Sequence, residues 1–493
     1  MYYISTRDAA LRCTASQAIV QGLSRDGGLF LPERIPALER GALEKMKTMP
    51  YAERAVQVMK LYLEEFTEDE LRTYAGSAYG PDKFDTPAVA PLKRLDGGTA
   101  VLELWHGPTC AFKDMALQML PYLLTASLKK TGEEKTACIL VATSGDTGKA
   151  ALEGFRDVDR TEILVFYPKD GVSDIQKLQM VTQEGGNTGV CAVIGNFDDA
   201  QTGVKRIFSD PVLRERLAAD GKLLSSANSI NWGRVLPQIV YYISAYCDLL
   251  ASGAIRMGEK IDFCVPTGNF GNILAAYYAK RMGLPVGKLI CASNSNDVLT
   301  EFIRTGVYDR NRPFHATISP SMDILISSNL ERLLYLLSGS DEAVRGYMRQ
   351  LSETGRYAVT PELHAKIQES FACGCCDEAS TAETIGRVFK ERSYLIDTHT
   401  AVAWNVLEQY RRESGSRSMS VVVSTASAFK FCASVLTALG VEKQAEGTQI
   451  LRQLSETTGC PVPKPLAALD GKKIRFTKAV QKTEMADAVM ELL

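Results

Sequence analysis

The sequence lacks an excess of charge of either sign. Lysine and arginine together number 56, aspartate and glutamate 58, and the net charge at pH 7 is −2. Such a balance gives no general attraction to nucleic acid or to an anionic membrane surface. We therefore expect neither partner, and any phosphate binding must come from local sites.

Long apolar runs are also missing. The opening residues, Met-Tyr-Tyr-Ile-Ser-Thr-Arg-Asp, lack the apolar core of a signal peptide. The most apolar long stretch, 235–255, is interrupted by Pro237, Gln238 and Asp248, so we expect no transmembrane helix. Twelve cysteines are scattered along the chain without a secretory signal, which favours reduced thiols in a cytoplasmic protein.

A metal site is not expected either. Three cysteines lie close together, Cys373, Cys375 and Cys376, in the sequence Cys-Gly-Cys-Cys. A structural zinc site would need a fourth ligand, and no partner pair at finger-like spacing is evident. Free thiols are therefore the favoured interpretation of this cluster.

The length of 493 residues, with 45% hydrophobic and 23% charged residues, indicates a globular protein of more than one domain. Residues 1–90 are predicted to form a separate N-terminal domain. Helical spacing of apolar residues occurs at 15–23, charged periodic segments fill 39–80, and prolines mark a connector that ends near 91. Nothing in 1–90 indicates chemistry, so we expect this domain to pack against the main body.

From residue 98 onward, short apolar runs alternate with helical patterns. The runs predicted to be strands are 100–105, 137–143, 163–167, 190–194, 262–265, 289–292 and 420–423. The segment 115–129 has a helical pattern in which Pro121 predicts either a kink or a later start. This alternation predicts an α/β fold with parallel sheets over 91–493.

The first candidate for chemistry is a lysine after a Gly-Pro turn, in Glu103-Leu-Trp-His-Gly-Pro-Thr-Cys-Ala-Phe112-Lys113-Asp114. Apolar neighbours desolvate the amine of Lys113, which lowers its pKa and makes the neutral nucleophile accessible near pH 7. A Schiff-base lysine needs this property. The alternative is a surface lysine whose stem lies on apolar neighbours and whose ammonium lies in water.

Two loops between a strand and a helix have the composition of anion sites. In Thr143-Ser144-Gly145-Asp146-Thr147-Gly148-Lys149, backbone N–H groups at a helix start would suit a carboxylate. In Pro266-Thr-Gly268-Asn269-Phe270-Gly271-Asn272, glycines let the backbone wrap a phosphate. Tight turns also use such residues. Lys149 opposes the helix dipole, so it is either a ligand of a phosphate-bearing substrate or an ordinary exposed lysine.

Two further segments place polar groups near predicted ligand positions. Ser424-Thr425-Ala426-Ser427 follows a predicted strand, where a hydroxyl can face a pyridine nitrogen or simply cap the next helix. Ser229-Ile-Asn231-Trp-Gly-Arg234 precedes an apolar helix. Its arginine can bind a phosphate or carboxylate through two N–H groups, and its Asn or Ser can act as a cap.

Taken together, these stretches resemble a pyridoxal-phosphate enzyme of the tryptophan synthase β-subunit type, and more narrowly the threonine synthase family. Tyr3-Ile-Ser-Thr-Arg and Gln21-Gly-Leu-Ser-Arg-Asp-Gly-Gly-Leu-Phe-Leu-Pro32 resemble the extra N-terminal domain of that family. The resemblance implies a two-lobed parallel-sheet body, with a small lobe of about 115–235 inserted in the large lobe. In one departure, Ser427 and Ala428 stand where many members have His-Pro, which removes a proton-transfer group from this loop.

The resemblance also implies residue roles. Lys113 would bind pyridoxal phosphate covalently and act as the catalytic base, with Phe112 near the cofactor ring. The cofactor phosphate would be held by Gly268, Asn269, Phe270, Gly271 and Asn272, and the pyridine nitrogen would meet Thr425. Substrate would be bound by Ser144, Gly145, Asp146, Thr147, Lys149, Asn231 and Arg234, although Asp146 could instead contact the cofactor 3′-oxygen.

The activity implied is a lyase of threonine biosynthesis that converts O-phospho-L-homoserine and water to L-threonine and phosphate, as a monomer or homodimer. A related enzyme could release 2-oxobutyrate with phosphate, if water does not reach Cβ. A serine or threonine dehydratase would need no phosphate site. A non-catalytic regulatory protein on the same scaffold is a further alternative, which the intact Lys113 argues against.

Overall fold

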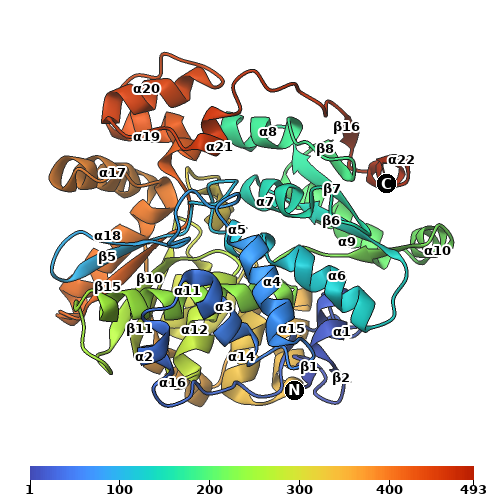
Figure 1. The fold of residues 1–493 in the computed structure, drawn as a ribbon, viewed down its shortest axis with the longest axis horizontal. Helices are drawn as coiled ribbons and strands as arrows, with labels where there is room; N and C mark the ends of the chain where they lie inside the picture. Colours follow the sequence, from blue (N-terminus) through green and yellow to red (C-terminus); the bar gives the residue numbers. More distant parts are fainter. Residues whose placement is uncertain (493) are drawn as a thin grey trace.

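The computed structural model describes residues 1–492, which form two mainly parallel sheets surrounded by helices, with the N-terminal segment packed along one side (Figure 1). The larger sheet has six strands in the order β14-β11-β10-β15-β5-β4, and only β4 runs antiparallel to its neighbour. Its strands are β4 (Leu92–Arg94), β5 (Thr99–Glu103), β10 (Ile261–Pro266), β11 (Val286–Ser293), β14 (Phe371–Cys375) and β15 (Ser420–Ser424).

The smaller sheet has five parallel strands in the order β16-β8-β7-β6-β9. They are β6 (Thr136–Ala142), β7 (Thr161–Pro168), β8 (Thr188–Ile194), β9 (Lys222–Ser225) and β16 (Ala479–Gln481). All seven predicted strands are confirmed, with ends shifted by up to three residues. Four strands of this sheet lie in the span expected for a small lobe, while β16 comes from the end of the chain.

Helices cover both sheets. Those packed on the smaller sheet are α7 (Asp146–Phe155), α9 (Phe197–Ser209), α10 (Pro211–Ala219) and α22 (Met485–Leu492). Those packed on the larger sheet are α11 (Trp232–Ala251), α12 (Gly271–Arg281), α13 (Val298–Thr305), α16 (Pro361–Ser370) and α18 (Thr398–Ser414). Over residues 1–492, none of the helices combines the length and hydropathy needed to span a bilayer.

The remaining elements connect or flank these layers. They are α8 (Asp174–Val181), β12 (Val307–Asp309), η1 (Pro320–Met322), α14 (Leu330–Ser338), α15 (Asp341–Thr354), β13 (Arg356–Ala358), α17 (Glu378–Arg392), η2 (Ala428–Phe431), α19 (Cys432–Ala438), α20 (Gln449–Thr458) and α21 (Lys464–Ala467). The pattern at 115–129 forms two helices, α5 (Asp114–Leu117) and α6 (Leu120–Lys130). Pro121 lies in the first turn of α6, where its missing N–H costs no hydrogen bond, so the helix starts later.

Three groups of buried apolar side chains form the core. The largest contains one face of each sheet, helices α11 and α12, and the N-terminal segment. The second lies between the other face of the larger sheet and helices α17 to α20. The third lies between the other face of the smaller sheet and helices α9, α10 and α22. Both sheets are therefore covered on both faces, which explains their nearly continuous apolar strands.

The N-terminal segment shares its core with the body. It contains a three-stranded antiparallel sheet, β1 (Tyr3–Ser5), β2 (Arg12–Cys13) and β3 (Phe30–Pro32), and helices α1 (Ala15–Gln21), α2 (Ala42–Met46), α3 (Tyr51–Met59) and α4 (Glu68–Ala78). The rings of Tyr3 and Tyr62 lie 5.5 and 5.6 Å from that of Trp232 on α11. These aromatic contacts join the segment to the helix that begins beside the candidate site.

A buried arginine ties three distant segments together. Arg332 on α14 is fully buried, and its Nε donates to the carbonyl of Phe30 at 2.8 Å. Its Nη2 donates to the carbonyl of Ile230 at 2.6 Å, and its Nη1 donates to Asn329. The guanidinium therefore links β3, the loop before α11 and the start of α14.

Replacing this arginine tests how far the body depends on that link. The substitution Arg332→Met leaves the carbonyls of Phe30 and Ile230 without this donor, so we expect it to lower the free energy of unfolding by roughly 2–5 kcal/mol. The urea midpoint followed by circular dichroism measures the change. Arg349→Met on α15 removes an exposed arginine and serves as the matched control. Equal midpoints for the two variants would contradict the link.

Candidate active site

A cavity of about 1500 Å³ opens where the carboxyl ends of strands from both sheets meet. Thr143 after β6, Thr267 after β10 and Thr425 after β15 all line it. Ligands of open α/β sheets bind at such strand ends. The sequence offered no site in the N-terminal segment, yet Arg7 and Arg25 also line this cavity.

Lys113 lies in this cavity, directly before α5. Its Nζ is 3.3 Å from Ser321 Oγ and 3.8 Å from Asp146 Oδ2. Its Nζ also lies 5.0 Å from the centre of the Phe112 ring. Burial lowers the pKa of Lys113 to about 8, although the carboxylate of Asp146 opposes that shift. The sequence-based expectation of a desolvated amine is consistent with this position.

The carboxylate of Asp146 is shared with a second lysine. Lys430 is fully buried, and its Nζ lies 2.6 Å from Asp146 Oδ1 and 2.9 Å from the carbonyl of Thr109. Gln176 Nε2 also donates to Asp146 Oδ1, at 2.8 Å. Burial raises the pKa of Asp146, but the two nearby ammonium groups outweigh burial and hold it well below its usual range.

The start of α7 is shaped by backbone constraints. Thr143 Oγ1 accepts from the N–H groups of Gly145 and Gly148, at 2.9 Å each. Gly145 has φ of 133°, and a Cβ there would lie 2.5 Å from the Gln176 side chain, so a glycine is required. Ser144 and Thr147 line the cavity. The structure thus brings this predicted loop to the same cavity as Lys113.

The start of α12 forms a second cradle. Phe270, in the left-handed region with φ of 63°, precedes the helix and offers no side-chain cap. A Cβ on Gly268 would lie 2.5 Å from the carbonyl of Ser321, so the loop needs that glycine. Asn272 is buried, its Oδ1 accepts from the hydroxyls of Tyr241 and Tyr242, and its Nδ2 has no partner. Free donors at a helix start suit a phosphate.

The loop after β15 contributes Thr425 to the cavity. The Thr425 carbonyl accepts from the N–H of Phe112 at 2.8 Å, so this loop and the lysine loop are held together. Ser427 Oγ accepts from the N–H of Phe429 at 3.3 Å and caps η2. Ser427, which stands where the resembled family often has a histidine, therefore serves as a helix cap.

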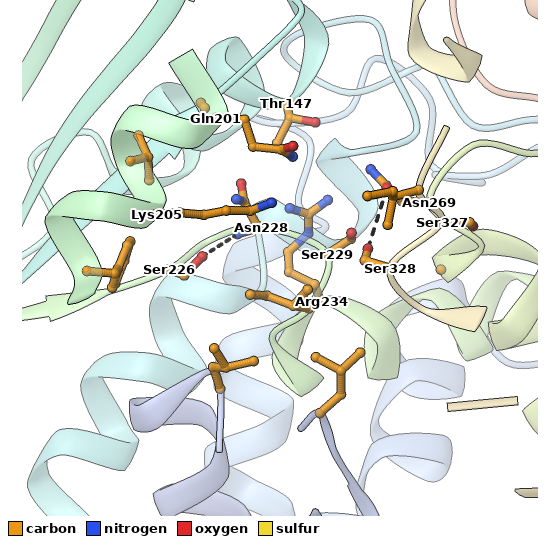
Figure 2. A pocket seen from close by; sticks show the side chains of 18 of the residues that line it. Thr147, Gln201, Lys205, Ser226, Asn228, Ser229, Arg234, Asn269, Ser327 and Ser328 are labelled. Atoms are coloured by element: carbon orange, nitrogen blue, oxygen red, sulfur yellow. Dashed lines mark hydrogen bonds between the residues drawn. The ribbon is translucent and has the colours of Figure 1, made fainter. Parts of the chain in front are cut away.

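Arg234 is the cation nearest the start of α11 in the cavity lining. It is buried, its Nη1 donates to the carbonyl of Ala227, and its Nε has no partner. Figure 2 shows its side chain extending toward the space between Asn228 and Thr147. Burial lowers the pKa of Arg234 to about 10. An unpartnered donor in this position suits an anionic ligand.

Four predicted substrate ligands, Gly145, Asp146, Lys149 and Asn231, do not line the cavity, and the last two are held by other partners. Asn231 Oδ1 accepts from the N–H of Gly233 at 2.9 Å, and its Nδ2 donates to the carbonyl of Ile19, so it caps α11. Lys149 is buried beside Glu153 Oε2, at 3.2 Å, and it also donates to Gln183. These partners, rather than a substrate, resolve the conflict of Lys149 with the helix dipole.

Sequence reasoning missed three groups around Lys113. Lys430 lies three residues beyond the predicted Ser424–Ser427 segment and had no predicted role, and Ser321 on η1 gave no signal. His399 lines the cavity, and its Nε2 accepts from the N–H of Ser321 at 3.1 Å. Its Nδ1 lies 3.0 Å from Asp397 Oδ1. The spacing of an aspartate and a histidine at a helix start could have indicated this pair.

The described residues, 1–492, contain no group of three or more His, Cys, Asp or Glu side chains arranged to hold a metal. Cys373 and Cys375 lie on β14 and Cys376 follows it, and all three are free thiols. Cys373 Sγ lies 3.4 Å from the carbonyl of Thr300, and Cys376 Sγ lies 3.3 Å from Thr381 Oγ1. Within residues 1–492, these two sulfur atoms thus contact a backbone carbonyl and a threonine hydroxyl.

A desolvated lysine that shares one cavity with two strand-to-helix loops suited to anions is the arrangement of a pyridoxal-phosphate enzyme. Residues 85–368 match the family model described as pyridoxal-phosphate dependent enzyme, and the chain belongs to this class. Residues 2–79 match the model described as threonine synthase N terminus. The two matches together cover the N-terminal segment and most strands of the body.

Comparison with individual similar proteins identifies a narrower family within this class. The chain is 40% identical over 417 residues to threonine synthase of Pseudomonas aeruginosa, covering 84% of this chain and 85% of that protein. It is 40% identical over 439 residues to human threonine synthase-like 1, covering 87% of this chain but only 58% of that protein. The crystal structure of pyridoxal-phosphate-bound threonine synthase from Brucella melitensis superposes with a TM-score of 0.87 at 37% identity, covering 100% and 99% of the chains.

This chain is therefore a member of the threonine synthase family, and pyridoxal phosphate is its cofactor. The residues present fit that group. The unpartnered Nδ2 of buried Asn272 and the free N–H groups of α12 would hold the phosphate. Lys113, Phe112 and Thr425 line the same cavity and would meet the ring.

The pKa of Lys113 can be measured in cofactor-free protein. Acetic anhydride reacts with the neutral amine only, so labelling of Lys113 is expected to rise with a midpoint near pH 8. Below that pH the ammonium form predominates and labelling falls. Mass spectrometry of the Lys113 peptide gives the midpoint, with the peptide of exposed Lys177 as the internal reference for the reagent. A midpoint above pH 10 would show a solvated lysine.

Two substitutions should move that midpoint in opposite directions. Asp146→Asn removes a charge that raises the pKa of Lys113, so the midpoint should fall. Lys430→Met removes a charge that lowers it, and frees Asp146 to attract Lys113, so the midpoint should rise. Lys177→Met on α8 is the control and should leave the midpoint unchanged. Shifts of the same sign in both variants would contradict the shared carboxylate.

Proposed function

We propose that this protein converts O-phospho-L-homoserine and water to L-threonine and phosphate. The observation that carries the proposal is the position of Lys113 in one cavity with two separate sets of anion donors. The α12 start accounts for the cofactor phosphate. The α7 start and Arg234 then remain for a substrate with a carboxylate and a second anionic group.

The reaction requires proton transfers at neighbouring carbons. Bound pyridoxal phosphate supplies an electron sink for negative charge at Cα. Lys113, with a pKa of about 8, is a suitable base to remove the Cα proton near neutral pH. Its flexible stem lets the same amine serve Cβ and Cγ as phosphate leaves from Cγ and water adds at Cβ. Asp146 and Ser321 border Nζ and restrict the positions it takes.

The loop after β15 does not take part in proton transfer in this proposal. Thr425 faces the cavity, but Ser427 caps η2 and Ala428 has no titratable group. Proton transfer therefore rests on Lys113. The twelve free cysteines suit a reducing compartment, and we place the enzyme in the cytoplasm.

The decisive experiment identifies the organic product. Protein loaded with pyridoxal phosphate is incubated with O-phospho-L-homoserine, and we expect L-threonine to form in step with phosphate. Lys113→Ala should reduce the rate by at least about 10³-fold, because it removes both the covalent anchor of the cofactor and the base. Amino-acid chromatography and a phosphate assay measure the two products.

Each alternative predicts a different result in that experiment. Phosphate with 2-oxobutyrate would identify a phospholyase and contradict threonine synthesis. Turnover of unphosphorylated threonine or serine would identify a dehydratase. A protein that binds the cofactor but releases no phosphate would contradict the substrate assignment, and failure to bind the cofactor at all would favour a regulatory role.

A further inference from the structure

The helix that carries His399 begins at the edge of the cavity. Asp397 is the N-cap of α18, both residues are buried, and His399 lines the cavity. Asp397 Oδ1 accepts from the His399 N–H at 2.9 Å and lies 3.0 Å from Nδ1 of the ring. Asp397 Oδ2 accepts from the N–H of Thr400 at 3.4 Å and from its hydroxyl. The capping carboxylate therefore also holds the imidazole ring in one orientation.

The contact on the other side of the ring fixes its tautomer. A backbone N–H can only donate, and the N–H of Ser321 meets His399 Nε2 at 3.1 Å. Nε2 is therefore the unprotonated nitrogen, and Nδ1 carries the proton that is donated to Asp397. The capping of α18 uses only the carboxylate and backbone N–H groups, so it does not require a histidine ring. The ring has a separate role, as a fixed acceptor for Ser321.

Ser321 contacts three parts of the cofactor site. Its Oγ lies 3.3 Å from Lys113 Nζ and 3.5 Å from Asp146 Oδ2. Its carbonyl oxygen lies so close to Gly268 that a Cβ there would approach it to 2.5 Å. The turn η1, which contains Ser321, spans only three residues, so its position depends on contacts from outside the turn. A shift of Ser321 would therefore change the surroundings of the lysine and of the α12 loop together.

We propose that His399, oriented by Asp397, is a positioning residue that sets the hydroxyl of Ser321 against the amine of Lys113. In this arrangement Ser321 Oγ accepts from the ammonium of Lys113 and donates to Asp146, so it orients Nζ. A hydrogen bond to the ammonium also favours the charged form and offsets part of the effect of burial. The proposal goes beyond the proposed function, because it concerns the lysine itself and not the substrate.

Acetylation of Lys113 in cofactor-free protein tests this link without any substrate. Ser321→Ala removes the acceptor of Lys113, and His399→Leu removes the acceptor of the Ser321 N–H. We expect each variant to lower the labelling midpoint of Lys113 by at least about half a pH unit, because the ammonium loses a hydrogen bond. His399→Gln places an amide oxygen near the position of Nε2 and should restore the wild-type midpoint. His315→Leu replaces an exposed histidine outside the cavity lining and is the matched control.

The double variant separates positioning from a general effect on packing. If His399 acts through Ser321, adding His399→Leu to Ser321→Ala lowers the midpoint no further. Additive shifts, an unchanged midpoint in His399→Leu, or a His399→Gln variant that behaves like His399→Leu would each overturn the proposal. If circular dichroism shows that His399→Leu does not fold, His399→Asn replaces it, because its amide retains a donor for Asp397 but is too short to reach Ser321.

The rate at which pyridoxal phosphate becomes covalently bound to Lys113 is the second measurement. Visible absorbance follows this rate at a pH above all the labelling midpoints, where the amine is neutral in every variant. We expect Ser321→Ala and His399→Leu to be at least about tenfold slower than wild type, because the amine is less well placed for attack. Equal rates in wild type and His399→Leu would contradict positioning. Neither measurement uses O-phospho-L-homoserine, so failure of this proposal and failure of the proposed function are distinguishable.

Discussion

The carboxylate of Asp146 lies between buried Lys430 and partly buried Lys113, which follow neighbouring strands of the larger sheet, while Asp146 itself starts a helix after a strand of the smaller sheet. One carboxylate cannot balance two ammonium groups in a desolvated region. Lys430 forms the short ion pair, at 2.6 Å, and Lys113 lies farther away, at 3.8 Å. Burial around Lys113 therefore prevails over the attraction of Asp146, and the pKa of its amine falls to about 8.

The same contacts fix the relative positions of three loops. Lys430 reaches the carbonyl of Thr109 on the lysine loop, and Thr425 accepts from the N–H of Phe112. Asp146 adds the helix start of α7 to this set. Because each loop follows a different buried strand, the sheets set where the loops begin and the ion pair sets where they meet. This arrangement preorganises the surroundings of Lys113 before any ligand binds.

The fold was largely predictable because parallel strands buried on both faces leave a local signature. The apolar runs at 137–143 and 420–423, for example, lie within one residue of strands β6 and β15. The glycines of the α7 and α12 loops were also visible locally, since Gly145 and Gly268 answer steric needs of the backbone. These features depend on residues close together in the chain.

The missed parts of the site depend on contacts between residues far apart. Ser321 is 208 positions from Lys113, and Lys430 is 321 from Thr109, so spacing gave no indication of either contact. Lys149 was predicted as a phosphate ligand because its charge opposes the dipole of its own helix. One partner of Lys149, Glu153, lies four residues later on that helix, and the other, Gln183, is 34 positions away. Short-range patterns predict where loops occur, but the partners of a buried charge follow from tertiary packing.

The buried Arg332 has a consequence for the order in which the molecule assembles. Its hydrogen bonds join it to Phe30 and Ile230, at separations of 302 and 102 positions along the chain. Contacts of such long sequence separation are costly in chain entropy and form slowly. We therefore expect the loop before α11, which carries part of the cavity wall, to reach its final place only when the first and third quarters of the chain have come together. Completion of the cavity is then expected to be a late event in folding.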